Sequence, residues 1–104
     1  MSDFMRVCKV TDLPDPGKTV VEVGDRLVAL FHASGTFWAL DDVCTHDGGP
    51  LAEGTLEGFT VACPRHGAKF DIRTGRVLSM PATRDTVAHR VKVENGEVWI
   101  QLAE

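Results

Sequence analysis

The sequence predicts an all-β protein, and three observations support this prediction. Apolar residues nowhere recur at helical spacing over a long window. Short valine-rich runs are instead separated by turns, and the 10 glycines and 5 prolines are spread along the chain. An Asn95–Gly96 pair, the favoured two-residue turn of a β-hairpin, joins two alternating runs near the end of the sequence. We therefore expect a small antiparallel β-sandwich or barrel-like base that carries an inserted, loop-rich subdomain.

Five earlier runs have the composition of strands. They cover residues 4–10, 19–23, 26–33, 36–40 and 59–63. Two-residue steps at 24–25 and 34–35, each with a glycine, join the second run to the third and the third to the fourth. Segment 11–18 contains two prolines and a glycine, and we expect it to be a loop.

The last hairpin has a predictable register because its turn has a fixed length. With only residues 95 and 96 in the turn, three facing pairs follow on one side of the sheet. They are Val93 with Val98, Val91 with Ile100, and His89 with Leu102. Turn chemistry and apolar pattern therefore agree on the same face for burial.

Length and charge restrict the function. A chain of 104 residues suits one compact domain, and a net charge of −4 disfavours nucleic acid as a partner. No stretch approaches the length of a membrane-spanning helix, and the first ten residues lack the apolar core of a signal peptide. Three cysteines are an odd number, which argues against a disulfide framework. A cytoplasmic location without membrane attachment is expected.

Two Cys/His pairs lie in the middle of the chain. They form the pattern Cys44-x-His46, sixteen residues, then Cys63-x-x-His66. Four such ligands hold zinc or an iron–sulfur cluster. Common structural zinc sites pair like with like, whereas each segment here offers one thiolate and one imidazole, which favours a dinuclear centre. Within a single domain, 1–104, we expect a base over 1 to about 41 and about 71 to 104, with the metal-binding insert over about 42–70.

The stretches "CTHDGGPL" and "CPRHGAKFDIRTG", with the flanks "FWALDDVCTH" and "GRVLSMPA", resemble the Rieske [2Fe–2S] family over most of the chain. The resemblance is to the soluble Rieske-type ferredoxins of multicomponent oxygenases. It implies one [2Fe–2S] cluster per chain. Cys44 and Cys63 are then expected on one iron, and His46 and His66 on the other, which lies nearer to solvent. Family likeness also suggests that residues 79–82, "SMPA", form a third loop that shields the cluster.

This resemblance implies an electron carrier without catalytic residues of its own. It is expected to pass single electrons from a flavin-containing, NAD(P)H-oxidising ferredoxin reductase to the terminal oxygenase of an aromatic dioxygenase system. Docking of both proteins is expected at the tip that carries His46 and His66, in a small and transient interface. A monomer is expected.

Two alternatives stay open at this point. The first is a Rieske-fold small subunit of a larger redox enzyme, such as an assimilatory nitrite reductase. Many such subunits lack some of the ligands, whereas this chain has all four. The second alternative is a zinc-bound interaction module without redox activity, which would be colourless and EPR-silent after reduction.

Neighbouring residues indicate a reduction potential at the low end of the Rieske range. The respiratory relatives carry a Ser and a Tyr, whose hydroxyls donate to sulfur, where this chain has Ala68 and Phe70. They also carry two disulfide-forming cysteines where this chain has Gly49 and Arg65. Fewer donors to sulfur leave the reduced cluster less stabilised, which lowers the potential.

Four further residues invite a functional interpretation. We interpret Cys8 as a small buried thiol. We interpret His89 as a hydrogen-bonded or edge-located structural histidine rather than a fifth ligand. For the Asp41–Asp42 pair, docking feature and solvated turn are both possible, and the turn is favoured.

Overall fold

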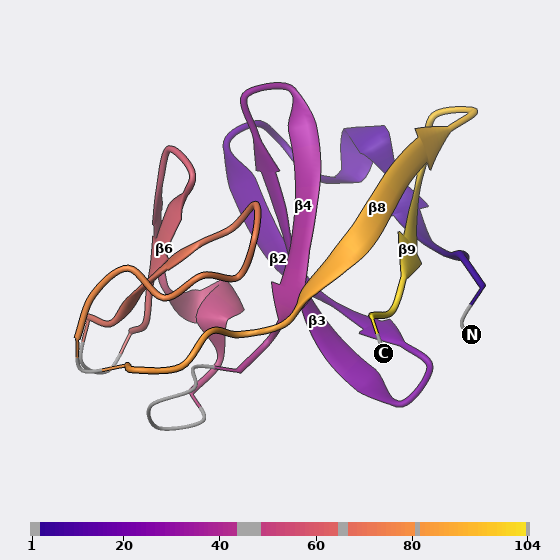
Figure 1. The fold of residues 1–104 in the computed structure, drawn as a ribbon. Helices are drawn as coiled ribbons and strands as arrows, with labels where there is room; N and C mark the ends of the chain where they lie inside the picture. The colour runs from indigo at the N-terminus through magenta and orange to yellow at the C-terminus, as the bar shows by residue number, and fades with distance from the viewer. Residues whose placement is uncertain (1–2, 44–48, 65–66, 81, 104) are drawn as a thin grey trace.

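The computed structural model spans the whole chain and describes residues 3–43, 49–64, 67–80 and 82–103 (Figure 1). Nine strands and two short 3₁₀ turns are assigned within these ranges. In order they are β1 Met5–Lys9, η1 Val10–Asp12, β2 Gly17–Val23, β3 Arg26–Ala33, β4 Thr36–Asp41, η2 Leu51–Glu53, β5 Thr55–Glu57, β6 Thr60–Ala62, β7 Lys69–Asp71, β8 Ala88–Glu94 and β9 Glu97–Gln101. The all-β prediction is confirmed.

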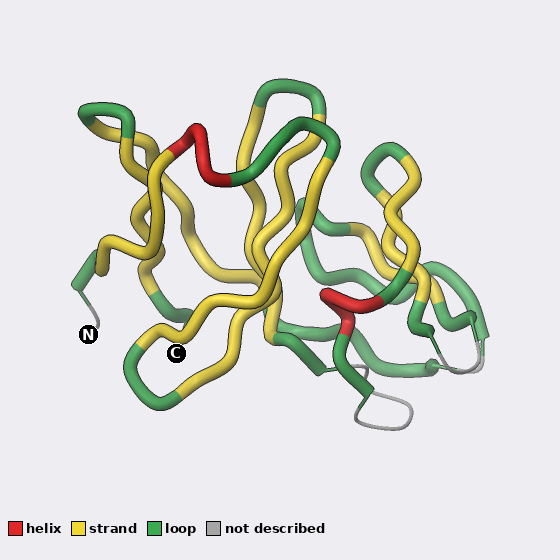
Figure 2. Tube along the Cα trace, turned by 180° about the vertical axis from the view of Figure 1, so that it is seen from behind, coloured by secondary structure: helices red, strands yellow, loops and turns green. Residues whose placement is uncertain are grey.

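Two sheets make up the fold. The large sheet has the strand order β1-β9-β8-β4-β3-β2, and the small sheet has the order β5-β6-β7. The edge strands β1 and β2 approach each other, so the large sheet is nearly closed into a barrel. Seen from behind, the small sheet lies to one side of the large sheet (Figure 2).

Strands β3 and β4 separate two buried cores. The barrel core lies inside the large sheet and consists of Leu13, Val23, Val28, Leu30, Phe37, Ala39, Val98 and Ile100. The junction core lies between the large sheet and the small sheet. It consists of Ala29, Phe31, Ala33, Leu40, Leu51, Val61, Cys63, Ala68, Phe70, Ile72 and Ala82.

Burial on both faces explains the composition of β3. Val28 and Leu30 point into the barrel core, whereas Ala29 and Phe31 point into the junction core, and all four are 0% exposed. A strand covered on one side alternates apolar and polar residues, but a strand covered on both sides is continuously apolar. The run "LVALFHA" is therefore the sequence of a strand that supports two cores.

Glycine turns set the hairpins of the large sheet. The turns at 24–25 and 34–35 join β2 to β3 and β3 to β4, as expected. Gly24 has φ +63° and Gly35 has φ +77°, which a residue without a side chain adopts without strain. In the last hairpin, Asn95 at φ +54° and Gly96 at φ +75° match the turn that this pair predicts.

The register of the last hairpin is confirmed for two of the three expected pairs. Val93 faces Val98 and Val91 faces Ile100, but β9 ends at Gln101, so the third pair is not part of the ladder. Burial differs between the two strands: Val93 on β8 is 53% exposed, whereas its partner Val98 and also Ile100 on β9 are 0% exposed.

Several strand boundaries differ from the prediction, and two strands were not expected. Segment 11–18 is not entirely a loop, because η1 occupies its first residues and β2 begins at Gly17, which pairs with His32. Strand β6 covers only Thr60–Ala62 of the expected run 59–63. Strands β5 and β7 were not expected, since three-residue strands are too short to show a period. The division into base and insert stays a prediction.

Candidate metal centre

Cys63 directly follows β6 and is the one predicted ligand that the structure describes. It is 3% exposed and packs in the junction core. Its backbone N–H donates to the Ala68 carbonyl at 2.7 Å, and its carbonyl accepts from the N–H of Gly67 at 3.1 Å. Gly67 has φ +75°, which allows the chain to turn back within a few residues. Cys63 therefore sits at the base of a tight, hydrogen-bonded loop.

The other three predicted ligands, Cys44, His46 and His66, lie outside the described residues. So do Arg65 and Pro81. Within the described ranges, no group of three or more Cys, His, Asp or Glu side chains is placed to hold a metal ion. The ligand assignment from the sequence stays a prediction.

The described ends of the two Cys/His segments meet in the junction core. Leu51, which closes the first segment, is 0% exposed and packs in the same cluster as Cys63. Ala82, from the predicted third loop, is 3% exposed and belongs to that cluster as well. Three stretches that are distant in sequence therefore converge on one side of the small sheet. A buried soft thiol at this convergence fits a thiolate-bound metal cluster.

The predicted third loop, residues 79–82, is attached to β7 and carries an exposed methionine. The Lys69 N–H donates to Ser79 Oγ at 3.2 Å, and the Leu78 N–H donates to the Lys69 carbonyl at 2.7 Å, so the loop is attached to β7. Met80, by contrast, is 73% exposed. Whether this loop shields a cluster stays a prediction.

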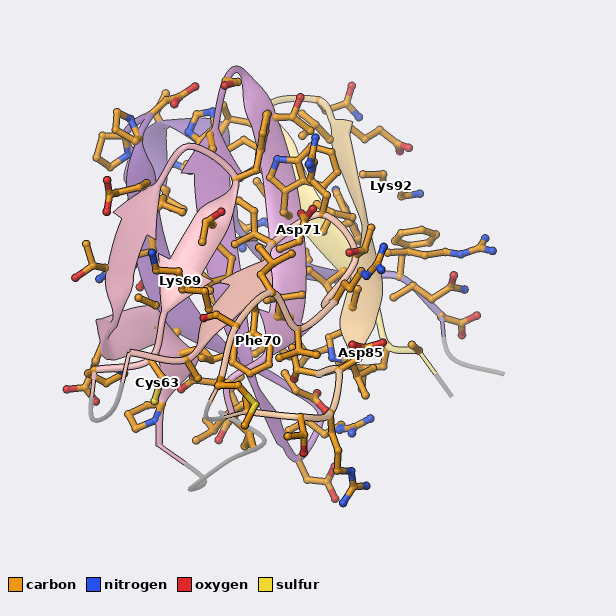
Figure 3. All side chains as sticks on the ribbon, turned by 60° about the vertical axis from the view of Figure 1, so that its left-hand side comes forward. Cys63, Lys69, Phe70, Asp71, Asp85 and Lys92 are labelled. Carbon is orange, nitrogen blue, oxygen red and sulfur yellow. The ribbon has the colours of Figure 1, made fainter. Side chains whose placement is uncertain are left out.

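Ala68 and Phe70 are both 0% exposed and belong to the same core as Cys63. Figure 3 shows Cys63 and Phe70 at the same end of the small sheet. Neither side chain has a hydrogen-bond donor, so neither stabilises a negatively charged sulfur nearby. The low reduction potential stays a prediction, and the buried position of Ala68 makes it testable.

The Asp41–Asp42 pair is not a solvated turn, and that interpretation was wrong. Asp41 Oδ1 lies 2.7 Å from His89 Nε2, and Asp41 Oδ2 lies 3.3 Å from Arg26 Nη2. Asp42 is 9% exposed, and its Oδ1 accepts from the Ala52 N–H at 2.8 Å. The pair lies at a strand end, where a turn and a structural carboxylate have the same sequence signature.

His89 is confirmed as a structural histidine. Its side chain is 0% exposed, and its Nδ1 accepts from the Ala103 N–H at 2.9 Å. An acceptor at Nδ1 leaves the ring proton on Nε2, which donates to Asp41. Both ring nitrogens are therefore used within the base of the protein.

Cys8 is only half-buried, which corrects the expectation of a small buried thiol. It lies on β1 and packs against the barrel core rather than the junction core. Burial raises the pKa of the Cys8 thiol; nearby Asp12 raises it further, and Arg6 opposes this effect. A protonated thiol is a poor metal ligand.

Asp71 and Arg73 form an ion pair that the sequence reasoning missed. Arg73 Nε and Nη2 donate to the two Asp71 oxygens at 3.1 and 3.0 Å. This hydrogen bonding lowers the pKa of the Asp71 carboxyl below its usual value. The Arg73 guanidinium also lies 4.4 Å from the centre of the Phe59 ring. The only signal in the sequence is a short "DIR", which is common on any surface.

Comparison with known proteins identifies related sequences over nearly the whole chain. The model of the Rieske [2Fe–2S] domain family matches residues 3–95. The 3-phenylpropionate/cinnamic acid dioxygenase ferredoxin subunit of Photorhabdus laumondii is 43% identical, and the match covers 94% of this chain and 93% of the relative. The ferredoxin component of naphthalene 1,2-dioxygenase/salicylate 5-hydroxylase systems from a Ralstonia species is 35% identical, with 88% of both chains covered.

A solved structure is also similar. A chain in the complex of reduced oxygenase and oxidized ferredoxin in carbazole 1,9a-dioxygenase superposes with a TM-score of 0.90 at 33% identity. The superposition covers 97% of this chain and 94% of that one. Separately, within the residues that the structure describes, no helix has the length and apolar character needed to cross a membrane.

Proposed function

This chain belongs to the Rieske [2Fe–2S] domain family, and we propose that it is the ferredoxin component of an aromatic dioxygenase system. In this role it carries one electron at a time and catalyses no bond change itself. The observation that supports this most directly is the near end-to-end similarity to proteins named as dioxygenase ferredoxins. The structure adds a buried thiol, Cys63, where three segments of the chain converge.

We assign the cluster ligands from the family motif. Cys44 and Cys63 would bind one iron, and His46 and His66 would bind the other. A [2Fe–2S] cluster supplies a site that gains and loses a single electron. The surrounding chain leaves Cys63 only 3% exposed to water, and Leu51, Ala68 and Phe70 belong to the same core.

The partners follow from the same proposal. A flavin-containing ferredoxin reductase, which oxidises NAD(P)H, would supply the electrons, and a terminal oxygenase would receive them. The similar carbazole 1,9a-dioxygenase structure contains a ferredoxin together with its oxygenase. We propose that this chain docks on its partners through the tip that bears His46 and His66, as a monomer in the cytoplasm.

Spectroscopy and a reconstituted assay test this function. Protein isolated anaerobically should contain iron and sulfide in equal amounts, and after dithionite reduction it should give the low average g value of mixed His/Cys ligation. It should then transfer electrons from a reductase to an aromatic-ring dioxygenase. A colourless, zinc-containing, EPR-silent protein would instead establish the zinc module. Isolation in a stable complex with a large reductase would support the subunit alternative.

A further inference from the structure

The backbone N–H and carbonyl of Ala52 are held by two side chains from separate parts of the large sheet. Asp42 Oδ1 accepts from the Ala52 N–H at 2.8 Å. Lys18 Nζ donates to the Ala52 carbonyl at 2.8 Å. Asp42 directly follows β4, and Lys18 lies on β2, so both come from a different sheet than β5, which begins at Thr55.

These contacts close the loop that carries the first Cys/His segment. Residues 43–51 lie between the two partners of the Asp42–Ala52 hydrogen bond, and by sequence they include Cys44 and His46. On one side, the Asp42 N–H donates to the Leu27 carbonyl at 3.2 Å. On the other side, Leu51 is fully buried in the junction core. Each end of the loop is therefore attached to rigid structure.

The surroundings of Asp42 suit this role. The residue is 9% exposed, so its hydrogen bond competes little with water. A carboxylate that accepts a backbone N–H makes one of the stronger hydrogen bonds in proteins. Burial of a carboxylate without a hydrogen-bond partner is costly. The hydrogen bond from the Ala52 N–H offsets this cost for Asp42 at the start of the loop.

We propose that Asp42 is a positioning residue for the metal centre, assisted by Lys18, and that the two fix the first Cys/His segment through the backbone of Ala52. The inference rests on the proposed function, because the segment needs positioning only if it binds the cluster. Fixed loop ends reduce the conformations available to Cys44 and His46. If the Asp42–Ala52 hydrogen bond is removed, the ends of the loop are no longer held together. The metal ligands on this loop should then dissociate from iron more often.

The experiment compares iron release from anaerobically purified, cluster-loaded protein. Asp42→Ala removes the acceptor, whereas Asp42→Asn keeps an oxygen that accepts from the Ala52 N–H. The rate of iron transfer to a ferrous chelator after dithionite reduction, the EPR line width, and amide exchange at Ala52 are measured for each. We expect Asp42→Ala to release iron about tenfold faster, as loss of a charge-assisted hydrogen bond allows. We expect Asp42→Asn to remain within about twofold of the wild-type rate, as a retained hydrogen bond allows.

A matched control is available at the opposite end of β4. Asp15 accepts from the Ser34 and Gly35 N–H groups at 3.2 and 2.6 Å, so its carboxylate also holds a loop by backbone hydrogen bonds. Asp15→Ala should lower the thermal stability but leave iron release and EPR line width unchanged. Lys18→Met keeps the alkyl chain, removes the second contact, and should accelerate iron release less than Asp42→Ala does. It provides the test if Asp42→Ala fails to fold.

Each outcome separates the inference from the proposed function. If wild-type protein shows no mixed-ligand EPR signal, the proposed function fails and this inference fails with it. If the wild-type signal is present, three results overturn the inference alone. The first is a rate of iron release in Asp42→Ala equal to that of wild type, or the same result in Lys18→Met where Asp42→Ala does not fold. The second is a rate of iron release in Asp15→Ala as high as in Asp42→Ala. The third is a rate of iron release in Asp42→Asn equal to that in Asp42→Ala.

Discussion

At the scale of single residues, the two described cysteines have different surroundings. Cys63 is buried in the junction core beside Leu51 and Ala82, whereas Cys8 is half-buried against the barrel core. The motif spacing predicts Cys63 as a ligand, and the structure places this residue in the junction core. The contact of Asp42 with Ala52 was not predictable, because it depends on how a loop of nine residues closes.

Substitution of the two cysteines should give opposite results. Cys63→Ser should abolish the characteristic visible absorption and EPR signal, because a serine hydroxyl stays protonated and binds iron weakly. Cys8→Ser is the control and should keep iron content and spectrum, with a loss in stability of about 1 kcal/mol. Iron analysis and EPR of both variants check this. Iron loss in Cys8→Ser would contradict the assignment.

Ala68→Ser should raise the reduction potential modestly. The side chain at 68 is fully buried in the cluster that contains Cys63, so a hydroxyl placed there has few acceptors other than sulfur. A donor to sulfur stabilises the reduced, more negative cluster. Spectroelectrochemical titration of wild type and variant measures the effect. A potential equal to that of wild type would show that residue 68 points away from the cluster.

The Asp71–Arg73 pair predicts a pH dependence with a definite sign. Because the pKa of Asp71 is lower in the folded state than in the unfolded state, its charge stabilises the fold at neutral pH. This contribution is lost as the pH falls through the lowered pKa. Asp71→Asn should therefore have a lower Tm than wild type at pH 7, and the difference should shrink in acid. Thermal unfolding of both proteins at neutral and at acidic pH checks this, because the pH effects of the other groups are common to both proteins and cancel in the difference. A difference independent of pH would contradict it.

At the scale of elements, turn chemistry was the reliable sequence signal. Glycines at positive φ end strands in four hairpins, and those of the large sheet were predicted because Gly or Asn–Gly marks them locally. The small sheet was mostly missed. Its strands of three residues exist through pairing with neighbours, and Phe70 also bridges to Val77 across a loop.

Two glycines of the β5–β6 region should respond differently to the same change. Gly54 has an ordinary φ of −78°, but a methyl group there would collide with the Ala62 carbonyl. Gly54→Ala should cost about 1–3 kcal/mol through this overlap. Gly58 lies in the turn at φ +58° with open space around it, so Gly58→Ala should cost about 1 kcal/mol through backbone strain alone.

The measurement is the free energy of unfolding, together with the cluster content of each variant. Gly54 directly follows η2 and lies two residues beyond Ala52, so we expect cluster content to fall in Gly54→Ala only. Equal stability loss in both variants, with the cluster intact in each, would argue against the close approach of Gly54 to β6.

At the scale of the whole molecule, the central strands β3 and β4 make the unfolding of the two cores cooperative. The pairing of β4 with β8 joins residues 39–40 to 88–89, a contact that no local pattern in the sequence reveals. Topology therefore had to come from the structure, even though most strands of the large sheet were predicted correctly. Both faces of β3 and β4 are covered, so the barrel core and the junction core share a common wall.

A substitution in one core should therefore weaken the other. Leu30→Ala removes a fully buried side chain from the barrel core and should cost about 2–5 kcal/mol. We expect the globally protected amides of β6 and β9 to lose hydrogen-exchange protection by the same factor. Loss confined to β9 would mean that the small sheet unfolds as a separate unit.

The shared wall also limits how the redox part can be used elsewhere. Residues 42–87, cut out and placed on a foreign scaffold, would leave Leu51, Val61 and Phe70 without the aromatic and aliphatic surface of Phe31 and Leu40. A transplant that is meant to keep its metal would have to take β3 and β4 along. Because β3 and β4 are also buried in the barrel core, the smallest portable unit is the two sheets together.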